Sequence, residues 1–300
     1  MIAEERYEEK LPVALGRKFA DISQLVKLRL SMLVVFSAVI AFVLASTEAI
    51  DWSRLIMLVI GGFLVTGAAN GFNQVIEKQP DGLMNRTRNR PLPTGRMSSA
   101  EVIALCVFMG ISGVLILGFF TTWLTALFGA LSLVLYSFVY TPLKKKGPIA
   151  VYIGAIPGAM PPLLGWVAAT GEYGLLPGLL FAVQFMWQFP HFWAIAWVAD
   201  ADYRKADYHL LPLRSGRNRG SAMFILVATL LLLPVSLLPV YFGFGGAVTY
   251  VVTIGMGLML LAQSIRLLRT CEDKHARQVM FGSFIYLPVI QLVLMIDKMI

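Results

Sequence analysis

Charged residues are scarce in this sequence, and their scarcity excludes a soluble protein. Only 14% of the 300 residues are charged, whereas 58% are hydrophobic, and the mean hydropathy is +0.74. A soluble domain of this length needs more polar surface to cover its core, but a bilayer can face apolar side chains directly. We therefore expect a membrane protein.

Cysteine is almost absent, and so is any targeting signal. The two cysteines, Cys106 in an apolar run and Cys271 in a charged segment, argue against a disulfide or a cysteine-bound metal. The first nine residues contain four glutamates and no long apolar stretch, which is unlike a signal or transit peptide. Residues 1–27 are therefore predicted to form a short cytoplasmic segment.

The apolar residues gather into long runs. A transmembrane helix needs about 20 predominantly apolar residues to cross the hydrocarbon core. Nine runs meet this requirement: 28–46, 55–77, 101–120, 122–140, 149–169, 175–199, 220–240, 246–265 and 279–296. The sequence thus predicts an all-α, polytopic membrane protein, a bundle of nine transmembrane helices that forms a single domain over residues 1–300.

Positive charges gather in alternate connections between these runs. The connections and ends on one predicted side hold 23 of the 25 Lys and Arg, counting Arg29 at the membrane edge. These segments are 1–27, 78–100, 141–148, 200–219 and 266–278. Because cytoplasmic loops carry such an excess, we predict a cytoplasmic N-terminus and an external C-terminus. The net charge of +8 then reflects topology, and no nucleic-acid partner is expected.

Two acidic clusters lie at the ends of predicted spans. Asn73 and Glu77, four residues apart, share one helix face, and Asp81 follows Pro80, where the helix is expected to stop. Asp200, Asp202 and Asp207 follow the sixth span. Both spans run in the same direction, so both clusters are predicted on one membrane face. Carboxylates and amides are hard oxygen ligands that suit Mg²⁺ held jointly with substrate phosphates.

Basic residues accompany the acids. The alternating Arg86, Arg88 and Arg90 fit a phosphate ligand, because guanidinium groups bind phosphate oxygens in pairs. Lys144, Lys145, Arg204 and Lys205 lie on the same predicted face, although lysine runs also serve as topology signals. Acids for Mg²⁺ and cations for phosphate, at the mouth of an apolar bundle, predict a lipid diphosphate site.

These motifs resemble a known family. Asn73-x3-Glu77-x3-Asp81 followed by NRTRNRPLPTGR is similar to the first motif of the UbiA-type intramembrane prenyltransferases, and the nine spans with a second Asp-rich motif extend the resemblance over the whole chain. Within that superfamily, TRNRPLP, YTPLKKK and WQFPHFWAIAW resemble the haem O synthase (protohaem IX farnesyltransferase) branch. The usual Asp-Asp-Tyr reads Ala201-Asp202-Tyr203 here, which leaves Asp200 and Asp202 as alternative metal ligands; the place of Asp202 before Tyr-Arg-Lys favours it.

The resemblance implies an enzyme that transfers a farnesyl group from farnesyl diphosphate to a vinyl group of haem B, with addition of water. It implies Mg²⁺ as cofactor and a place in the cell membrane with the active-site loops on the cytoplasmic side. It also implies haem A synthase or respiratory oxidase assembly proteins as partners. Asn73, Glu77, Asp81 and Asp202 would be catalytic, and aromatic walls would shield the carbocation. Tyr136, Tyr140 and Trp187 are candidates for those walls.

Histidine is rare, and one of the three lies inside a predicted span. His191 follows Pro190 between aromatic residues, so it either bonds a carbonyl freed by the proline or contacts haem, for example as an axial ligand. His209 and Tyr203 are further candidate haem contacts. His275, in a charged loop, is expected to be solvated.

Two other functions fit parts of this pattern. A prenyltransferase of the same type could use another aromatic or tetrapyrrole acceptor, which the QFPHFW sequence argues against. A secondary transporter of an anionic substrate would suit inner cations and the repeated LP, GR and SA flanks after the two acidic clusters. Transporter sites, however, lie near the bilayer midplane, where this sequence is almost free of charge.

Overall fold

The computed structural model describes residues 10–47 and 49–299, and within these ranges the chain forms helices and turns without any strand. The four N-terminal glutamates and Glu48 lie outside the described residues. The helices are α2 (Lys10–Leu25), α3 (Leu28–Ala45), α4 (Trp52–Ile76), α5 (Lys78–Leu83), α6 (Ser99–Phe120), α7 (Trp123–Val134), η1 (Leu135–Tyr140), α8 (Thr141–Leu143), η2 (Lys144–Lys146), α9 (Ile149–Thr170), α10 (Leu175–Val198), α11 (Asp200–Lys205), α12 (Arg219–Tyr241), α13 (Ala247–Thr270) and α14 (Asp273–Met299).

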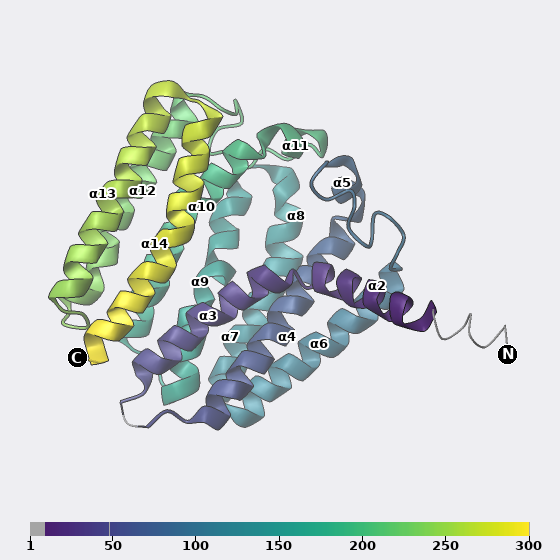
Figure 1. Ribbon diagram of the computed structural model, residues 1–300, viewed down its shortest axis with the longest axis horizontal. Helices are drawn as coiled ribbons and strands as arrows, with labels where there is room; N and C mark the ends of the chain where they lie inside the picture. Colours follow the sequence, from purple (N-terminus) through teal and green to yellow (C-terminus); the bar gives the residue numbers. More distant parts are fainter. Residues whose placement is uncertain (1–9, 48, 300) are drawn as a thin grey trace.

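The long helices form a closed ring. Each of α3, α4, α6, α7, α9, α10, α12, α13 and α14 contacts the next along the chain, and α14 contacts α3 (Figure 1). Consecutive helices run in opposite directions, so the short elements α5, α8 and α11 gather at one end of the bundle (Figure 1). We call this the α5–α11 end. The position of α5 and α11 at this end confirms that both acidic motifs share one end of the bundle.

Eight of these helices are long and apolar enough to cross a membrane, by length and composition alone. The ninth predicted span is α10, which has 24 residues and no charged side chain but is less apolar than the other eight. Its buried polar residues Gln184, Gln188 and His191 account for the difference. Because α10 packs against α9, α12 and α14, these groups face protein rather than lipid. A count of nine membrane crossings stays a prediction.

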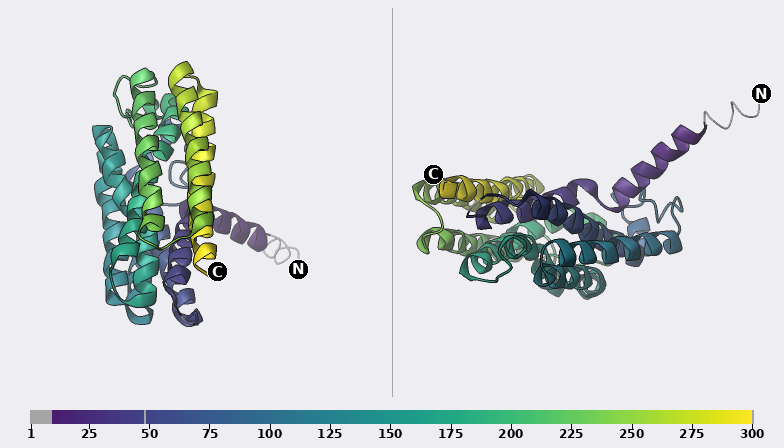
Figure 2. Two further views of the ribbon diagram at one scale, coloured as in Figure 1. Left: turned by 90° about the vertical axis from the view of Figure 1, so that its left-hand side faces the viewer. Right: turned by 90° about the horizontal axis from the view of Figure 1, so that it is seen from below.

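The segment before the first span is more ordered than expected. Residues 10–25 form helix α2, which projects from one side of the bundle (Figure 2). Leu25 and Val26 at its end are buried beside α4 and α6, next to Ala68 and Val102. This burial anchors the helix, and the prediction of a simple tail over residues 1–27 missed it.

The fourth span changes helix type partway along. The α-helical α7 continues into η1, a π-helical segment in which the N–H of Thr141 donates to the carbonyl of Tyr136, five residues earlier. The chain then stays helical through Lys146. The predicted loop at 141–148 is therefore largely an extension of this helix, and Lys144 is buried within it rather than solvated.

Candidate active site

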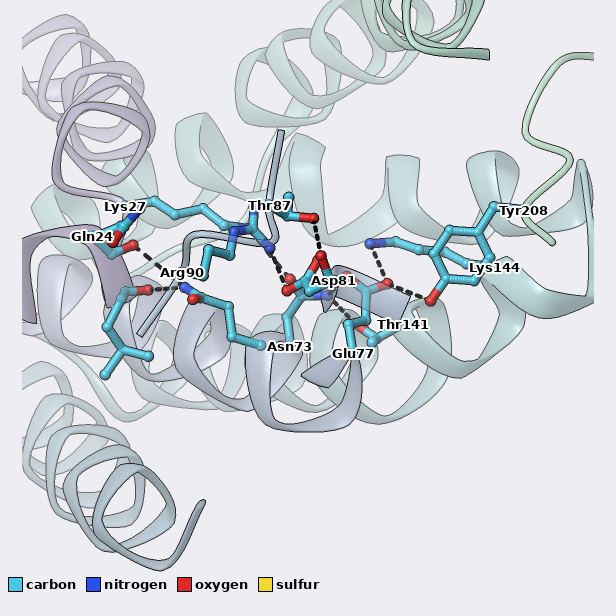
Figure 3. Close-up of polar contacts among 12 residues, drawn as sticks. Gln24, Lys27, Asn73, Glu77, Asp81, Thr87, Arg90, Thr141, Lys144 and Tyr208 are labelled. Carbon is cyan, nitrogen blue, oxygen red and sulfur yellow. Dashed lines mark hydrogen bonds and ion pairs between the residues drawn. The ribbon is translucent and has the colours of Figure 1, made fainter. Parts of the chain in front are cut away.

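The first acidic motif contains a break in the helix. We expected the helix to stop at Pro80, but α4 ends at Ile76 and α5 begins at Lys78, with Glu77 between them (φ −91°, ψ 13°). Pro80 lies in the first turn of α5, where its missing N–H costs no hydrogen bond. The bend leaves both Glu77 and Asp81 buried. The two carboxylates lie between Arg90 and Lys144 (Figure 3).

Glu77 is held by three groups, two of which come from distant segments. Its carboxylate accepts from Lys144 Nζ at 2.8 Å and from Asn73 Nδ2 at 3.0 Å, and Tyr208 Oη donates to it at 3.2 Å. Asn73 Nδ2 also donates to Thr141 Oγ1 at 3.1 Å. Burial alone would raise the pKa of Glu77, but the Lys144 cation outweighs it and holds that pKa below its usual value.

Asp81 has one satisfied and one unsatisfied oxygen. Oδ2 accepts from Arg90 Nη1 at 2.7 Å, whereas the buried Oδ1 has no hydrogen-bond partner. Thr87 fixes the same turn by donating to the Asp81 carbonyl at 2.8 Å. Burial raises the pKa of Asp81 despite the opposing effect of Arg90. A buried carboxylate oxygen without a donor is costly unless a cation binds it, so this atom fits a metal ligand.

A third cation comes from the corner between α2 and α3. Lys27 adopts a left-handed backbone (φ 49°), and its Nζ donates to Asn73 Oδ1 at 3.3 Å. Asn70 and Gln74 of α4 hold this corner by donating to the carbonyls of Val26 (3.3 Å) and Leu25 (2.6 Å). Burial, together with the neighbouring cations of the site, lowers the pKa of Lys27 to about 7.

The second acidic motif fixes the position of the loop that follows the first acidic motif. Asp202 accepts from the backbone N–H groups of Asn85 (2.8 Å) and Arg86 (3.1 Å), so α11 fixes the loop that follows α5. Burial acts to raise the pKa of Asp202, but these N–H groups and Lys205 together outweigh it and hold that pKa below its usual value. Asp200 turns away to Arg204 at 2.9 Å. Among residues 10–47 and 49–299, no three His, Cys, Asp or Glu side chains are arranged to hold a metal ion.

The predicted basic residues divide into two groups. Arg90 and Lys144 lie at the carboxylates, and Arg86 stacks over the Tyr203 ring at 4.3 Å. The others lie at the periphery: Arg204 and Lys205 pair with Asp200 and Asp202, while Arg88 and Lys145 are exposed. The structure thus places Arg90 and Lys144 directly at the first-motif carboxylates and the other predicted cations farther out.

An apolar cavity of about 290 Å³ lies inside the ring of helices. Residues of α3, α4, η1, α9, α10 and α14 line it. Tyr136, Tyr140 and Trp187 are among them, as expected for aromatic walls. Asn70, which precedes Asn73 by about one turn of α4, also lines the cavity, so the cavity leads towards the carboxylates.

His191 forms part of the cavity wall. Its Nδ1 is 2.9 Å from Ser283 Oγ, and its ring stacks on Trp187 at 4.3 Å and meets Phe284 edge-on at 4.5 Å. The hydrogen-bond partner of His191 is thus a hydroxyl on α14 and not a carbonyl freed by Pro190. His209, by contrast, lies on the exposed side of the loop after α11, 3.2 Å from Asp207.

The sequence reasoning missed Lys27, Thr141 and Tyr208. Thr141 and Tyr208 lie 68 and 131 residues from their partners in the first motif, and Lys27 lies 46 residues from Asn73. One feature of the sequence indicates the contact with the corner between α2 and α3. Asn70, Asn73 and Gln74 are polar residues inside an apolar run, and polar groups within a bilayer need hydrogen-bond partners from other segments.

Comparison with known proteins agrees with this architecture. Residues 34–287 match the UbiA prenyltransferase family. The protoheme IX farnesyltransferase of Cytophaga hutchinsonii is 45% identical over 284 residues, which cover 95% of this chain and 99% of that protein. Two solved structures share the fold. A digeranylgeranylglyceryl phosphate synthase has a TM-score of 0.74 at 19% identity, covering 94% of this chain and 99% of that one. A UbiA homologue from Archaeoglobus fulgidus, bound to DMAPP and Mg²⁺, has a TM-score of 0.62 at 12% identity, covering 92% and 99%.

Proposed function

The chain belongs to the UbiA prenyltransferase family, and from that premise we propose that it transfers a farnesyl group from farnesyl diphosphate to a vinyl group of haem B with addition of water, giving haem O and diphosphate. The whole chain, residues 1–300, acts as one transmembrane prenyltransferase domain. The observation that carries the proposal is the meeting of Glu77, Asp81, Arg90 and Lys144 beside an apolar cavity, where Lys144 Nζ lies 4.8 Å from the ring of the cavity-lining Tyr140. A diphosphate head fits the charged end, and a prenyl chain fits the apolar one.

Mg²⁺ is the proposed cofactor. The unpaired Oδ1 of Asp81 supports this, because hard carboxylate oxygens beside a phosphate site suit that ion. Glu77 and Asp81 would bind it together with the substrate phosphates. Asp202 and Asp200 would complete the proposed set of metal ligands by giving up their present hydrogen bonds and ion pairs. When bound, Mg²⁺ would neutralise charge on the diphosphate and so make it a better leaving group.

The residues around the carboxylates have separate tasks. Arg90 and Lys144 bind the diphosphate oxygens and stabilise the charge that develops on them as the C–O bond breaks. Lys27, Arg86, Arg88, Lys145, Arg204 and Lys205 supply further positive charge around the head group. Tyr136, Tyr140 and Trp187 face the prenyl chain, where their rings stabilise a carbocation and exclude stray water.

Haem B binds farther along the cavity. His191 is its proposed contact within the bundle, and Tyr203 and His209 are proposed contacts near the rim. The protein lies in the cell membrane with the α5–α11 end on the cytoplasmic side. That side carries the excess of Lys and Arg, which supports this orientation. Haem A synthase or an oxidase assembly protein is the proposed recipient of the product.

One assay tests the function directly. Purified protein in lipid nanodiscs is incubated with haem B, farnesyl diphosphate and Mg²⁺, and the products are identified by mass spectrometry. We expect haem O and diphosphate. Parallel reactions with a quinone precursor and a chlorophyllide should give no product. Transfer to either of these but not to haem B would overturn the assignment of the acceptor while leaving prenyl transfer intact.

A further inference from the structure

The hydrogen bonds around His191 fix the position of its ring proton. Ser283 Oγ carries a single hydrogen and donates it to the carbonyl of Met280 at 2.7 Å. The 2.9 Å contact between the same oxygen and His191 Nδ1 must therefore run from Nδ1–H to Oγ. In the neutral imidazole, Nε2 is then the unprotonated nitrogen and carries a free lone pair.

Neighbouring groups hold the ring in one orientation. Trp187 stacks on His191 at 4.3 Å with an interplanar angle of 17°, and its own Nε1 donates to the carbonyl of Ser283 at 2.7 Å. Phe284 contacts the same ring edge-on, with 4.5 Å between the ring centroids. The ring is 5% exposed and lines the cavity. A basic nitrogen held this rigidly, in a cavity that is otherwise largely apolar, is costly unless it has a partner or a task.

A second acceptor lies beside it on α10. Gln188 precedes His191 by three residues, which makes the two side chains neighbours on the helix surface. Gln188 Nε2 donates to the carbonyl of Ala155 at 2.8 Å, so its Oε1 is the atom left for the cavity, which Gln188 also lines. Two acceptors can hold both hydrogens of one water molecule. The lone pairs of that water then point away from the helix, into the space for the acceptor substrate.

We propose that His191 is a catalytic base that holds and deprotonates the water molecule added to the vinyl group, with Gln188 as a positioning residue. This inference rests on the proposed function. The C–O bond of farnesyl diphosphate breaks, and its electron pair leaves with diphosphate. The vinyl π electrons form the new C–C bond, which leaves a cation on the vinyl carbon next to the porphyrin. The water oxygen bonds to that carbon, and one of its protons passes to His191 Nε2.

The composition of the product tests the role of His191. Without the base, the cation loses a proton from the neighbouring carbon, which gives a farnesylated haem lighter by one water. We expect His191→Gln to lower the ratio of hydroxylated to dehydrated product by at least about a hundredfold, the lower end of what a positioned base contributes. His275→Ala is the matched control and should keep the wild-type ratio, because His275 lies in the first turn of α14 and contacts Thr270 at the end of α13.

Two further measurements decide the alternatives. Ser283→Ala keeps the imidazole but frees its tautomer, so we expect a smaller change in the same direction even if His191→Gln fails to fold. An unchanged ratio in both variants would mean that another group, such as the released diphosphate, takes the proton. A shift of the Soret band of bound haem in His191→Gln would make Nε2 an iron ligand and would overturn the proposal. Failure of wild-type protein to farnesylate haem would instead reject the proposed function.

Discussion

The buried ion pair between Lys144 and Glu77 offers the most informative perturbation. The two side chains are 11% and 5% exposed, so solvent screens their 2.8 Å contact little. Breaking a buried pair by removing one partner costs about 3–5 kcal/mol, because the other charge stays buried and uncompensated. Since Asn73 and Tyr208 still donate to Glu77, we expect Lys144→Met to lower the free energy of unfolding by about 3 kcal/mol, the lower end of that range.

The double variant separates stability from function. Lys144→Met with Glu77→Gln leaves no buried charge, and replacing a buried pair by neutral groups is often close to neutral, so stability should recover to within about 1 kcal/mol of wild type. Activity should not recover, because both proposed diphosphate and metal contacts are gone. Unfolding is measured by titration with denaturing detergent in the presence of a chelator. Lys146→Met, at an exposed lysine of the same run, is the control.

The contribution of Glu77 to the free energy of unfolding should change with pH in opposite directions in the wild type and in Lys144→Met. In the wild type, the pKa of Glu77 is lowered, so the stability from the pair is present at neutral pH and is lost as pH falls through the folded-state pKa. Without Lys144, burial dominates and raises the pKa of Glu77, so the deficit of Lys144→Met should shrink as pH falls. A single variant that loses less than about 1 kcal/mol, as an exposed pair would, refutes the buried-pair reasoning.

Three other results are expected. Replacing Glu77, Asp81 or Asp202 by Ala should reduce turnover at least about a hundredfold through loss of transition-state stabilisation. The controls Asp51→Ala and Glu172→Ala should keep wild-type turnover. Near-normal activity of Asp81→Ala at saturating Mg²⁺ would reject Asp81 as a metal ligand. In a cysteine-free background, cysteines introduced at positions 89 and 215 should react with a membrane-impermeant reagent from one side of the membrane, and a cysteine at position 173 from the other side. Reaction of positions 89 and 215 from opposite sides would contradict a site shared by the two acidic motifs. Gln184 Nε2 donates at 2.8 Å to the carbonyl of Gly158, because Pro162 has no N–H to donate to that carbonyl. We therefore expect Gln184→Leu to lower the free energy of unfolding by about 1–3 kcal/mol, and the additional change Pro162→Ala to recover part of that loss. Losses that simply add in the double variant would contradict this account.

The spans were predictable because hydropathy reports directly on the environment that a membrane helix must face. Errors fell where charged residues continue a helix past the apolar run. The predicted loop 266–278 is mostly helical: α13 extends to Thr270 and α14 begins at Asp273. Charged side chains at these ends point to solvent while the backbone keeps its helical hydrogen bonds, so hydropathy alone places the boundary too early.

The site was predictable to the extent that it is local. Asn73 and Glu77 are one helical turn apart, and their hydrogen bond follows from that spacing. Lys27, Thr141 and Tyr208 come from other segments of the chain, and no spacing rule connects them to Glu77. Asp202 shows a different limit. A carboxylate at a helix end can bind a metal or accept from backbone N–H groups, and only the packing of α11 against the loop after α5 shows that Asp202 accepts from the N–H groups of Asn85 and Arg86.

The π-helical segment η1 sets the angular position of everything that follows it in the fourth span. A segment with hydrogen bonds from residue i to i+5 accommodates one more residue per turn than the α-helix around it, which is the geometry that a single inserted residue leaves in a helix. If residues 135–140 kept their number but followed α-helical geometry, the rest of the helix would be rotated by about 100°. Thr141 and Lys144 would then point away from Asn73 and Glu77, so the π-helical geometry of this segment is what turns both side chains towards the first acidic motif.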